Sequence, residues 1–271
     1  MKKCILAVLM AVSAPAMAAP IVANSVADFS GVQGFKHWYY GYFRKGQPTS
    51  PIYTPSGFHE YDTFGLYGNS PSWWDSVVQL GSGTQRYPSW RAQGGHPAGL
   101  GPDRQNEIVW SMLRYEAPTA GFVNISYHLA KENVVNPKGG GITGFIYVDG
   151  RKVFVKTIAN ADATGVSGVL LHIPVHFDSV IDFAISPLGF KPLLGTDSLY
   201  SARSDATIFT STITLTPSLS LLSARTAGLS PERDSSPVNE PSGIALALAG
   251  LFSITVFKRG PRAEKHAARM E

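Results

Sequence analysis

Two histidines near the middle of the chain, His172 and His176, have the spacing of a metal-binding pair. On a helix, residues four apart share one face and can ligate the same metal ion. Here Pro174 interrupts the segment, and the alternating pattern around it predicts a strand in which four residues span about 13 Å. That separation is too large for one metal ion, so we predict no metal site and treat both histidines as polar residues of a loop and a sheet face.

Three pairs of carboxylates are close in sequence, and hydrolysis of a glycosidic bond needs two carboxyl groups about 5 to 9.5 Å apart. The pairs are Glu60 with Asp62, Asp103 with Glu107, and Asp178 with Asp182. Each lies in or next to an expected turn, where carboxylates commonly cap backbone groups. The sequence also contains no nucleophile elbow, phosphate loop or dinucleotide fingerprint. We therefore assign no catalytic residue and expect no cofactor.

Tryptophans in turn-rich sequence offer a different chemistry, because sugar rings present C–H faces that stack on aromatic side chains. Trp73, Trp74 and Trp90 lie among Ser, Pro and Gly residues, so we predict that at least one is exposed and binds a glycan. The alternative is that they are core residues, because large aromatic side chains contribute most to packing.

The elements that must position these residues are clearest between Asn106 and Pro217, where apolar residues recur at every second position. Alternation of this kind is typical of strands with one buried face. Asp149 and Gly150, which suit a two-residue type I′ turn, predict a hairpin. The expected strands cover residues 107–114, 123–129, 142–148, 152–158, 169–175, 181–185 and 206–216. This pattern predicts an all-β fold, an antiparallel β-sandwich or jelly roll.

The chain begins with the features of a secretory signal peptide. Lys2 and Lys3 precede an apolar run, and Ala16, Met17 and Ala18 supply the small residues of a cleavage site, so the mature chain should begin at Ala19. The single cysteine, Cys4, lies inside this signal. The exported chain then has no cysteine, which excludes disulfides and thiol catalysis.

The C-terminal part of the chain predicts a linker followed by a membrane segment. Residues 217–237 are rich in Ser, Thr, Ala and Pro, and residues 243–257 contain no charge. Fifteen helical residues span about 22 Å, somewhat less than the ~30 Å hydrocarbon core, so this is a short anchor. The bases that follow, at 258–269, should stay cytoplasmic and leave the folded domain facing outward. A C-terminal core helix is the alternative.

Asn239, Glu240 and Pro241, followed by the short apolar helix at 243–257 and the bases Lys258, Arg259 and Arg262, resemble the PEP-CTERM sorting tail of bacterial envelope proteins. The resemblance covers residues 237–262. It implies an exosortase-type processing enzyme as a partner, a Gram-negative bacterium that makes exopolysaccharide or biofilm, and a cell-surface or matrix destination. Asn239 stands where the family usually has proline, and the chain continues to Glu271 beyond the basic cluster.

The middle of the chain resembles secreted β-sandwich domains that often precede such tails. The resemblance rests on Gln33, the run from Trp38 to Tyr42, His96 with Pro97, Arg114 and the Asp149–Gly150 hairpin. It implies a fold and no particular activity. The aromatic-rich region from Asp28 to Pro102 has weaker periodicity, and we expect it to wrap one sheet and form long loops.

The charge distribution excludes a nucleic-acid partner for the folded part. The net charge of the 271-residue chain is +4, but the fourteen basic residues between 19 and 216 are matched by fourteen acidic ones. Proteins that bind phosphates need clustered Lys and Arg on the folded surface. Because these charges cancel, glycan binding by the domain should depend little on salt.

Together these observations divide the chain into a signal peptide (1–18), a β-sandwich domain (19–216), a linker (217–237) and a sorting tail (238–271). We predict a non-enzymatic protein that is exported to the cell envelope, surface or extracellular matrix and is anchored transiently or permanently in the inner membrane. Its expected ligand is extracellular polysaccharide. The rival hypothesis is a secreted polysaccharide-modifying hydrolase, which a deep cleft with convergent carboxylates would favour.

Overall fold

The computed structural model of the chain describes residues 19–46, 53–78, 86–99, 107–135, 140–189 and 205–218. The chain divides into two units, Met1–Leu229 and Ser230–Glu271, and every described residue belongs to the first. The expected signal peptide, nearly all of the linker and the whole sorting tail lie outside the described residues, and so do Ala16, Ala18 and every residue of the sorting motif and basic cluster. Within the described ranges, none of the helices has the length and apolarity that a membrane span requires.

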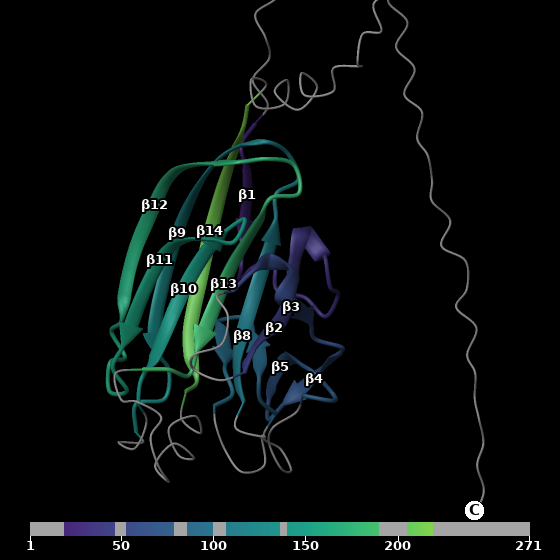
Figure 1. The fold of residues 1–271 in the computed structure, drawn as a ribbon. Helices are drawn as coiled ribbons and strands as arrows, with labels where there is room; N and C mark the ends of the chain where they lie inside the picture. Colours follow the sequence, from purple (N-terminus) through teal and green to yellow (C-terminus); the bar gives the residue numbers. More distant parts are fainter. Residues whose placement is uncertain are drawn as a thin grey trace, which may run out of the picture. The chain divides into compact units, whose positions relative to one another are not determined.

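Two antiparallel sheets make up the described domain (Figure 1). The larger sheet has eight strands in the spatial order β12, β9, β14, β7, β6, β5, β4, with β1 also paired to β14. These strands are β1 (Ile21–Asn24), β4 (Thr63–Tyr67), β5 (Ser70–Trp74), β6 (Ser89–Arg91), β7 (Gly94–His96), β9 (Gly121–Lys131), β12 (Val166–Val175) and β14 (Thr207–Pro217). Strands β1 and β7 pair with opposite ends of β14, so that both fit beside it.

The smaller sheet has six strands in the order β11, β10, β13, β8, β2, β3. They are β2 (Trp38–Gly46), β3 (Phe58–Glu60), β8 (Ile108–Glu116), β10 (Ile142–Val148), β11 (Arg151–Ile158) and β13 (Val180–Ser186). Two short 3-10 turns, η1 (Phe35–His37) and η2 (Pro55–Gly57), precede β2 and β3.

The all-β prediction is confirmed, and the strands expected after residue 106 correspond to β8 through β14. The hairpin prediction is confirmed in detail, since β10 and β11 pair on either side of Asp149 and Gly150. These two residues have φ angles of 50° and 79°. Positive φ at both central positions is what a type I′ turn requires.

The aromatic-rich region differs from the expectation that it wraps one sheet as long loops. It contributes strands to both sheets, β2 and β3 to the smaller and β4 to β7 to the larger. Four of these six strands have five residues or fewer with Ser, Gly or Pro within them. So few residues leave too little alternation for the sequence pattern to indicate a strand.

The main core lies between the two sheets and is rich in aromatic residues. Along β2, the alternating residues Trp38, Tyr40 and Tyr42 join this core, and from the other sheet Phe209 and Ile213 of β14 meet them. The rings of Phe183 and Phe209, on opposite sheets, contact edge to face with their centroids 5.6 Å apart. Fully burying such a side chain contributes roughly 1.5 to 3 kcal/mol, so this layer is the main source of the domain's stability.

Candidate functional site

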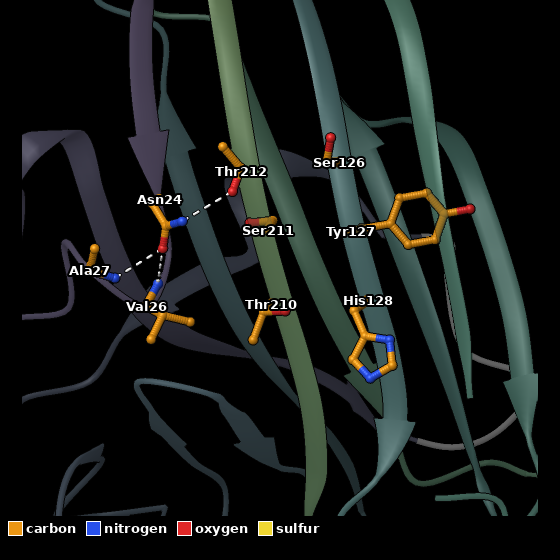
Figure 2. Close-up of a pocket in the computed structure, with 9 residues that line it drawn as sticks. All are labelled: Asn24, Val26, Ala27, Ser126, Tyr127, His128, Thr210, Ser211 and Thr212. Atoms are coloured by element: carbon orange, nitrogen blue, oxygen red, sulfur yellow. Dashed lines mark hydrogen bonds between the residues drawn. The ribbon is translucent and has the colours of Figure 1, made fainter. Parts of the chain in front are cut away.

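An open groove on the outer face of the eight-stranded sheet is lined mostly by polar residues (Figure 2). Its volume is about 500 Å³, within the range of roughly 300 to 1,000 Å³ typical of ligand sites. Three segments line it, namely the end of β1 with the turn that follows, the middle of β14 and the middle of β9. The polar side chains that matter most are Asn24, Ser126, His128, Thr210 and Thr212.

Strand register places these side chains in two rows across the sheet. Asn24 lies opposite Thr212, and Thr212 lies opposite Ser126. In the second row, Thr210 lies opposite His128. Neighbouring strands are about 4.7 to 4.9 Å apart, and rows two residues apart are separated by about 6.8 Å. The groove therefore presents polar groups on a regular grid.

The alternation of buried and outward residues fixes which side chains reach the groove. On β9, Ile125 and Leu129 are fully buried in the core, and on β14 Phe209 and Ile213 are equally buried. Because successive side chains of a strand point to opposite faces, the residues that alternate with them, Ser126, His128, Thr210 and Thr212, must face outward. A shift of one residue in register would exchange the two sets, so burial of the apolar residues also holds the polar rows in place.

Asn24 is held rigidly at the rim of the groove. Its Oδ1 accepts hydrogen bonds from the backbone N–H groups of Val26 and Ala27 at 3.0 and 2.9 Å, and its Nδ2 donates to Thr212 Oγ1 at 3.1 Å (Figure 2). Its own N–H donates to Asp28 Oδ2 at 2.7 Å. Burial opposes ionisation of Asp28, but hydrogen bonds from Lys36 and Asn24 hold its pKa below the ordinary value. The carboxylate therefore remains charged and keeps the turn ordered.

The second row continues onto β12 through His128. Ser167 pairs with His128 in the register of β12 and β9, and the His128 Nδ1 and Ser167 Oγ atoms are 2.8 Å apart. This contact fixes one ring nitrogen of His128 and leaves the other, Nε2, for a ligand. In the first row, Ser126 lies opposite Val169 of β12, which is exposed and apolar.

The groove is suited to hydrogen bonding with a polyhydroxylated ligand. Its side chains supply hydroxyl, amide and imidazole groups, which both donate and accept hydrogen bonds. Its nine lining residues include no carboxylate, lysine, arginine or cysteine. The groups in the groove can therefore recognise a polyol, and they do not include a pair of carboxylates of the kind that hydrolyses a glycosidic bond.

The prediction that Trp73, Trp74 or Trp90 is exposed is wrong. Their relative exposures are 5%, 4% and 1%. Trp73 of β5 lies opposite Trp90 of β6, and both belong to the main core. The Trp73 ring stacks on Tyr40 at 5.8 Å, and its Nε1 donates to Ser30 O at 2.8 Å.

Trp74 is buried differently, outside the main core. The guanidinium of Arg86 lies 4.1 Å from its ring centroid, and a Cβ added at Gly65 would approach its ring to 2.8 Å. The absence of a side chain at Gly65 therefore lets the ring pack against β4. The turn-like composition around these tryptophans concealed short strands, in which a large apolar side chain is buried rather than left in water. We therefore drop these residues as a glycan platform.

Three of the five described carboxylates in the pairs close in sequence make structural side-chain contacts. Asp62 accepts hydrogen bonds from Ser76, Glu107 pairs with Arg44, and Asp182 pairs with Arg114. Asp103 lies outside the described residues. These contacts agree with the capping interpretation for Asp62 and show that Glu107 and Asp182 form ion pairs.

Of the two histidines first considered as metal ligands, His172 lies at the bulge within β12 and His176 follows the end of that strand. The His172 ring stacks on Phe122 with a centroid distance of 4.0 Å, and the backbone N–H of His172 donates to Asn124 Oδ1 at 2.8 Å. His176 donates its backbone N–H to Ser179 Oγ. Among the described residues, no group of three or more metal-ligating side chains comes together.

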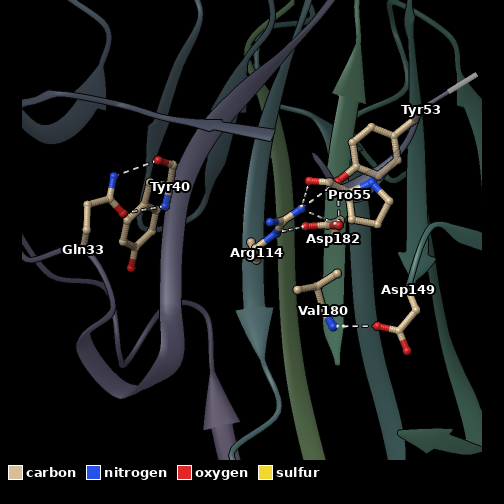
Figure 3. Close-up of polar contacts among 8 residues, drawn as sticks. All are labelled: Gln33, Tyr40, Tyr53, Pro55, Arg114, Asp149, Val180 and Asp182. Atoms are coloured by element: carbon tan, nitrogen blue, oxygen red, sulfur yellow. Dashed lines mark hydrogen bonds and ion pairs between the residues drawn. The ribbon is translucent and has the colours of Figure 1, made fainter. Parts of the chain in front are cut away.

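The outer face of the six-stranded sheet carries a buried polar network (Figure 3). Arg114 donates to both carboxylate oxygens of Asp182 at 2.7 and 3.1 Å, and to Pro55 O at 2.9 Å. The Tyr53 hydroxyl donates to Asp182 Oδ2 at 2.6 Å, and burial raises its pKa. The Phe58 ring lies 4.1 Å from the Arg114 guanidinium. The segment carrying Tyr53 and Pro55 therefore covers this face, which is filled rather than open.

A smaller crevice of about 310 Å³ lies between the β6–β7 turn, the β4–β5 turn and the segment after β9. Its charged groups, Arg91 and Glu132, are paired with each other. A ligand there would have to break this ion pair, which makes the crevice a weaker candidate than the groove.

Comparison with known proteins adds no family. No protein-family model matches the chain, and no curated protein does. Among solved structures, the chain is similar to a GH31 alpha-xylosidase from Xanthomonas citri, with 10% sequence identity and a TM-score of 0.20. The match covers 73% of this chain and 23% of that one, so the chain spans about a quarter of the length of that enzyme. A likeness at this level says nothing about activity.

Sequence reasoning missed the groove although its signals were present. The alternation that identified β9 also marks Ser126 and His128 as outward residues, and the threonines of β14 alternate with its apolar residues. What the sequence did not reveal is that β9 and β14 are neighbours, because 75 residues separate Lys131 from Thr207 in the chain.

Proposed function

We propose that this chain is an exported protein of the cell envelope or extracellular matrix that binds extracellular polysaccharide without chemically altering it. The observation that carries the binding proposal is the pair of polar rows formed by Asn24, Thr212 and Ser126 and by Thr210 and His128. The signal-like N-terminus and the PEP-CTERM-like tail support export and sorting, with an exosortase-type enzyme as processing partner.

The groove favours an extended polymer over a small enclosed ligand. It is open and crosses three adjacent strands, so a polysaccharide chain can lie along it and continue beyond both ends. Each hydrogen bond between a groove side chain and a sugar hydroxyl contributes little to the binding free energy, because the net contribution of one hydrogen bond is about 0.5 to 1.5 kcal/mol. Useful affinity then depends on several domains binding one polymer, which suits a protein held at a surface or in a matrix.

The rival hydrolase hypothesis has one observation in its favour, the two carboxylates Glu60 and Glu116. Burial and the neighbouring Glu116 raise the pKa of Glu60. A raised carboxyl pKa beside a second carboxylate is the arrangement of a general acid in glycosidases. If the chain releases reducing ends from the native exopolysaccharide, and Glu60→Gln abolishes this release, the hydrolase hypothesis replaces ours.

Two measurements test the proposed function. In native gels that contain exopolysaccharide from the producing cells, the full-length chain should migrate more slowly than in gels without it. The polymer should release no new reducing ends during prolonged incubation. Unretarded migration at every polymer concentration would refute binding, and steady release of reducing ends would refute the non-enzymatic assignment.

The sorting proposal has its own test. Deleting residues 243–271 should move the protein from the membrane fraction of the producing cells to the soluble exported fraction, because the apolar segment would be lost. Intact-mass analysis of the recovered wild-type protein should show a mature N-terminus at Ala19. Recovery of exported protein that still begins at Met1 would contradict the predicted cleavage.

A further inference from the structure

A second groove lies along one side of the domain, where each sheet ends in a strand that pairs on one side only among the described residues. Strand β11 ends the six-stranded sheet and β12 ends the eight-stranded sheet. Figure 1 shows the two strands on the same side of the domain. Residues of both strands line a groove of about 540 Å³, among them Lys152 and Val153 of β11 and Val169 and Leu171 of β12. This groove is distinct from the one over β1, β14 and β9.

Basic side chains gather on β11 without acidic partners. Arg151, Lys152 and Lys156 are all exposed, and none of them takes part in an ion pair or side-chain hydrogen bond within the described part of the chain. In contrast, Lys36 and Arg44 on the same sheet or beside it each pair with a carboxylate. The domain as a whole is neutral, but this edge carries an uncompensated positive charge.

Apolar side chains form the rest of this edge. Val169 and Leu171 of β12 are 55% and 69% exposed. Leu170 and Ile173 line the groove beside them. The surface therefore combines cations with contiguous apolar area, which suits a ligand that carries both negative charges and apolar C–H faces.

We infer that this edge groove binds a carboxylated, anionic polysaccharide. The inference rests on the proposed function and adds the chemical class of the polymer. Carboxylates of successive sugar rings would pair with Arg151 and Lys152, and the C–H faces between them would lie against Val169 and Leu171. A second copy of this chain is disfavoured as the occupant, because pairing two β11 edges would bring like charges together, a recognised way of blocking edge association.

The test uses the full-length chain and polygalacturonate, with its fully methyl-esterified form as an uncharged polymer of the same backbone. Binding to polygalacturonate should be strong at low salt and weaken as salt is raised, because exposed charges are screened. For an anionic polymer this replaces the small salt dependence that the neutral net charge of the domain predicts. The esterified polymer should bind at least tenfold more weakly. Equal binding to both polymers, or no binding to polygalacturonate at low salt, would overturn the inference.

Substitutions locate the site. Arg151→Gln and Lys152→Gln should each weaken binding to polygalacturonate by about two- to five-fold, the effect of one exposed ion pair. Lys156→Gln is the matched control, since Lys156 is equally exposed on β11 but does not line the groove. An equal loss in all three variants would show that net charge alone attracts the polymer and would overturn the assignment to this groove.

Two further arms separate this inference from its alternatives. Vesicles of phosphatidylglycerol test a lipid surface, and lysine-dependent binding to vesicles without binding to polygalacturonate would overturn the polysaccharide assignment. Ser126→Ala combined with Thr210→Val tests the groove of the proposed function while leaving every lysine in place. Loss of native exopolysaccharide binding in that variant, with polygalacturonate binding retained, would show that the two grooves act independently.

Discussion

The outer faces of the two sheets differ in what covers them. On the six-stranded sheet, the segment carrying Tyr53 and Pro55 lies over the face, and Arg114 and Asp182 are paired beneath it (Figure 3). On the eight-stranded sheet, the strand centres carry Ser126 and Thr210 and are left open. The first face is closed by the chain itself and contributes to stability. The second is ordered without being covered, which leaves it available to a ligand.

The comparison also shows that aromatic content alone does not identify a binding surface in this chain. The covered face contains Trp110 stacked on Phe145 at 4.9 Å, yet Trp110 is only 5% exposed. The open face of β9 and β14 presents hydroxyls and an imidazole. If the comparison is correct, substitutions on the covered face should change stability, and substitutions in the open groove should change binding.

The largest expected effect comes from breaking the network on the covered face. Arg114→Met removes the only cation paired with the fully buried Asp182 among the described residues, and should lower the free energy of unfolding by about 3 to 5 kcal/mol. The double variant Arg114→Met with Asp182→Leu should recover most of this loss. Urea unfolding measures both variants. A loss below about 1 kcal/mol for the single variant would show that this network is not needed to close the face.

A loss of similar size is expected from the buried tryptophans. Trp90→Ala leaves a cavity between the sheets and should cost about 3 to 5 kcal/mol, while exopolysaccharide binding by the remaining folded protein stays at the wild-type level. Trp73→Ala should behave in the same way. If either variant binds polysaccharide more weakly while its free energy of unfolding is unchanged, the tryptophans bind the glycan, contrary to the burial that the structure shows.

A buried carboxyl gives a pH-dependent effect of intermediate size. Burial raises the pKa of Asp205 to about 7, although Lys131 Nζ lies 3.0 Å from its Oδ1. An unfolded Asp titrates near 3.9, so between pH about 4 and about 7 the folded state holds a proton that the unfolded state has released. This group should therefore make the free energy of unfolding fall as pH rises through that window.

The Asp205→Asn variant removes this titration and should show a smaller decline in unfolding free energy between pH about 4.5 and about 7.5 than the wild type. Identical pH profiles for the wild type and Asp205→Asn would contradict the assigned pKa.

A smaller effect is expected at the rim of the open groove. Asn24→Ala removes the acceptor of the Val26 and Ala27 N–H groups and should cost about 1 kcal/mol, while weakening exopolysaccharide binding. Asn124→Ala is the matched control, because Asn124 accepts a hydrogen bond from the His172 N–H and does not line the groove. If both variants weaken binding equally, the effect comes from loss of stability rather than from the groove.

The sequence predicted the regular part of this fold better than its irregular part. Long strands such as β9 and β14 alternate over enough residues to be recognised, and the Asp149–Gly150 turn specifies its hairpin locally. Short strands such as β6 and β7 have three residues each, and their pairing is decided by tertiary contacts such as that between Gly94 and Ile208.

How much of the candidate site the sequence predicts depends on the same difference between local patterns and tertiary contacts. The outward positions of Ser126 and His128 follow from alternation within one strand. Their meeting with Thr210 and Thr212 depends on strand order, which no local pattern encodes. The tryptophans were misassigned for a related reason, because the neighbours that bury Trp73 and Trp90 come from distant segments of the chain.

The most direct test of the central claim is the affinity of a groove variant for native exopolysaccharide. Ser126→Ala combined with Thr210→Val removes two hydroxyls, and Thr216→Val removes one exposed hydroxyl from β14 outside the groove. All three changes should alter the unfolding free energy by less than about 0.5 kcal/mol each. We predict that the double variant loses about tenfold or more in affinity, at about 1 kcal/mol per hydrogen bond, and that the control keeps wild-type affinity. Wild-type affinity in the double variant, with the fold intact, would contradict the account.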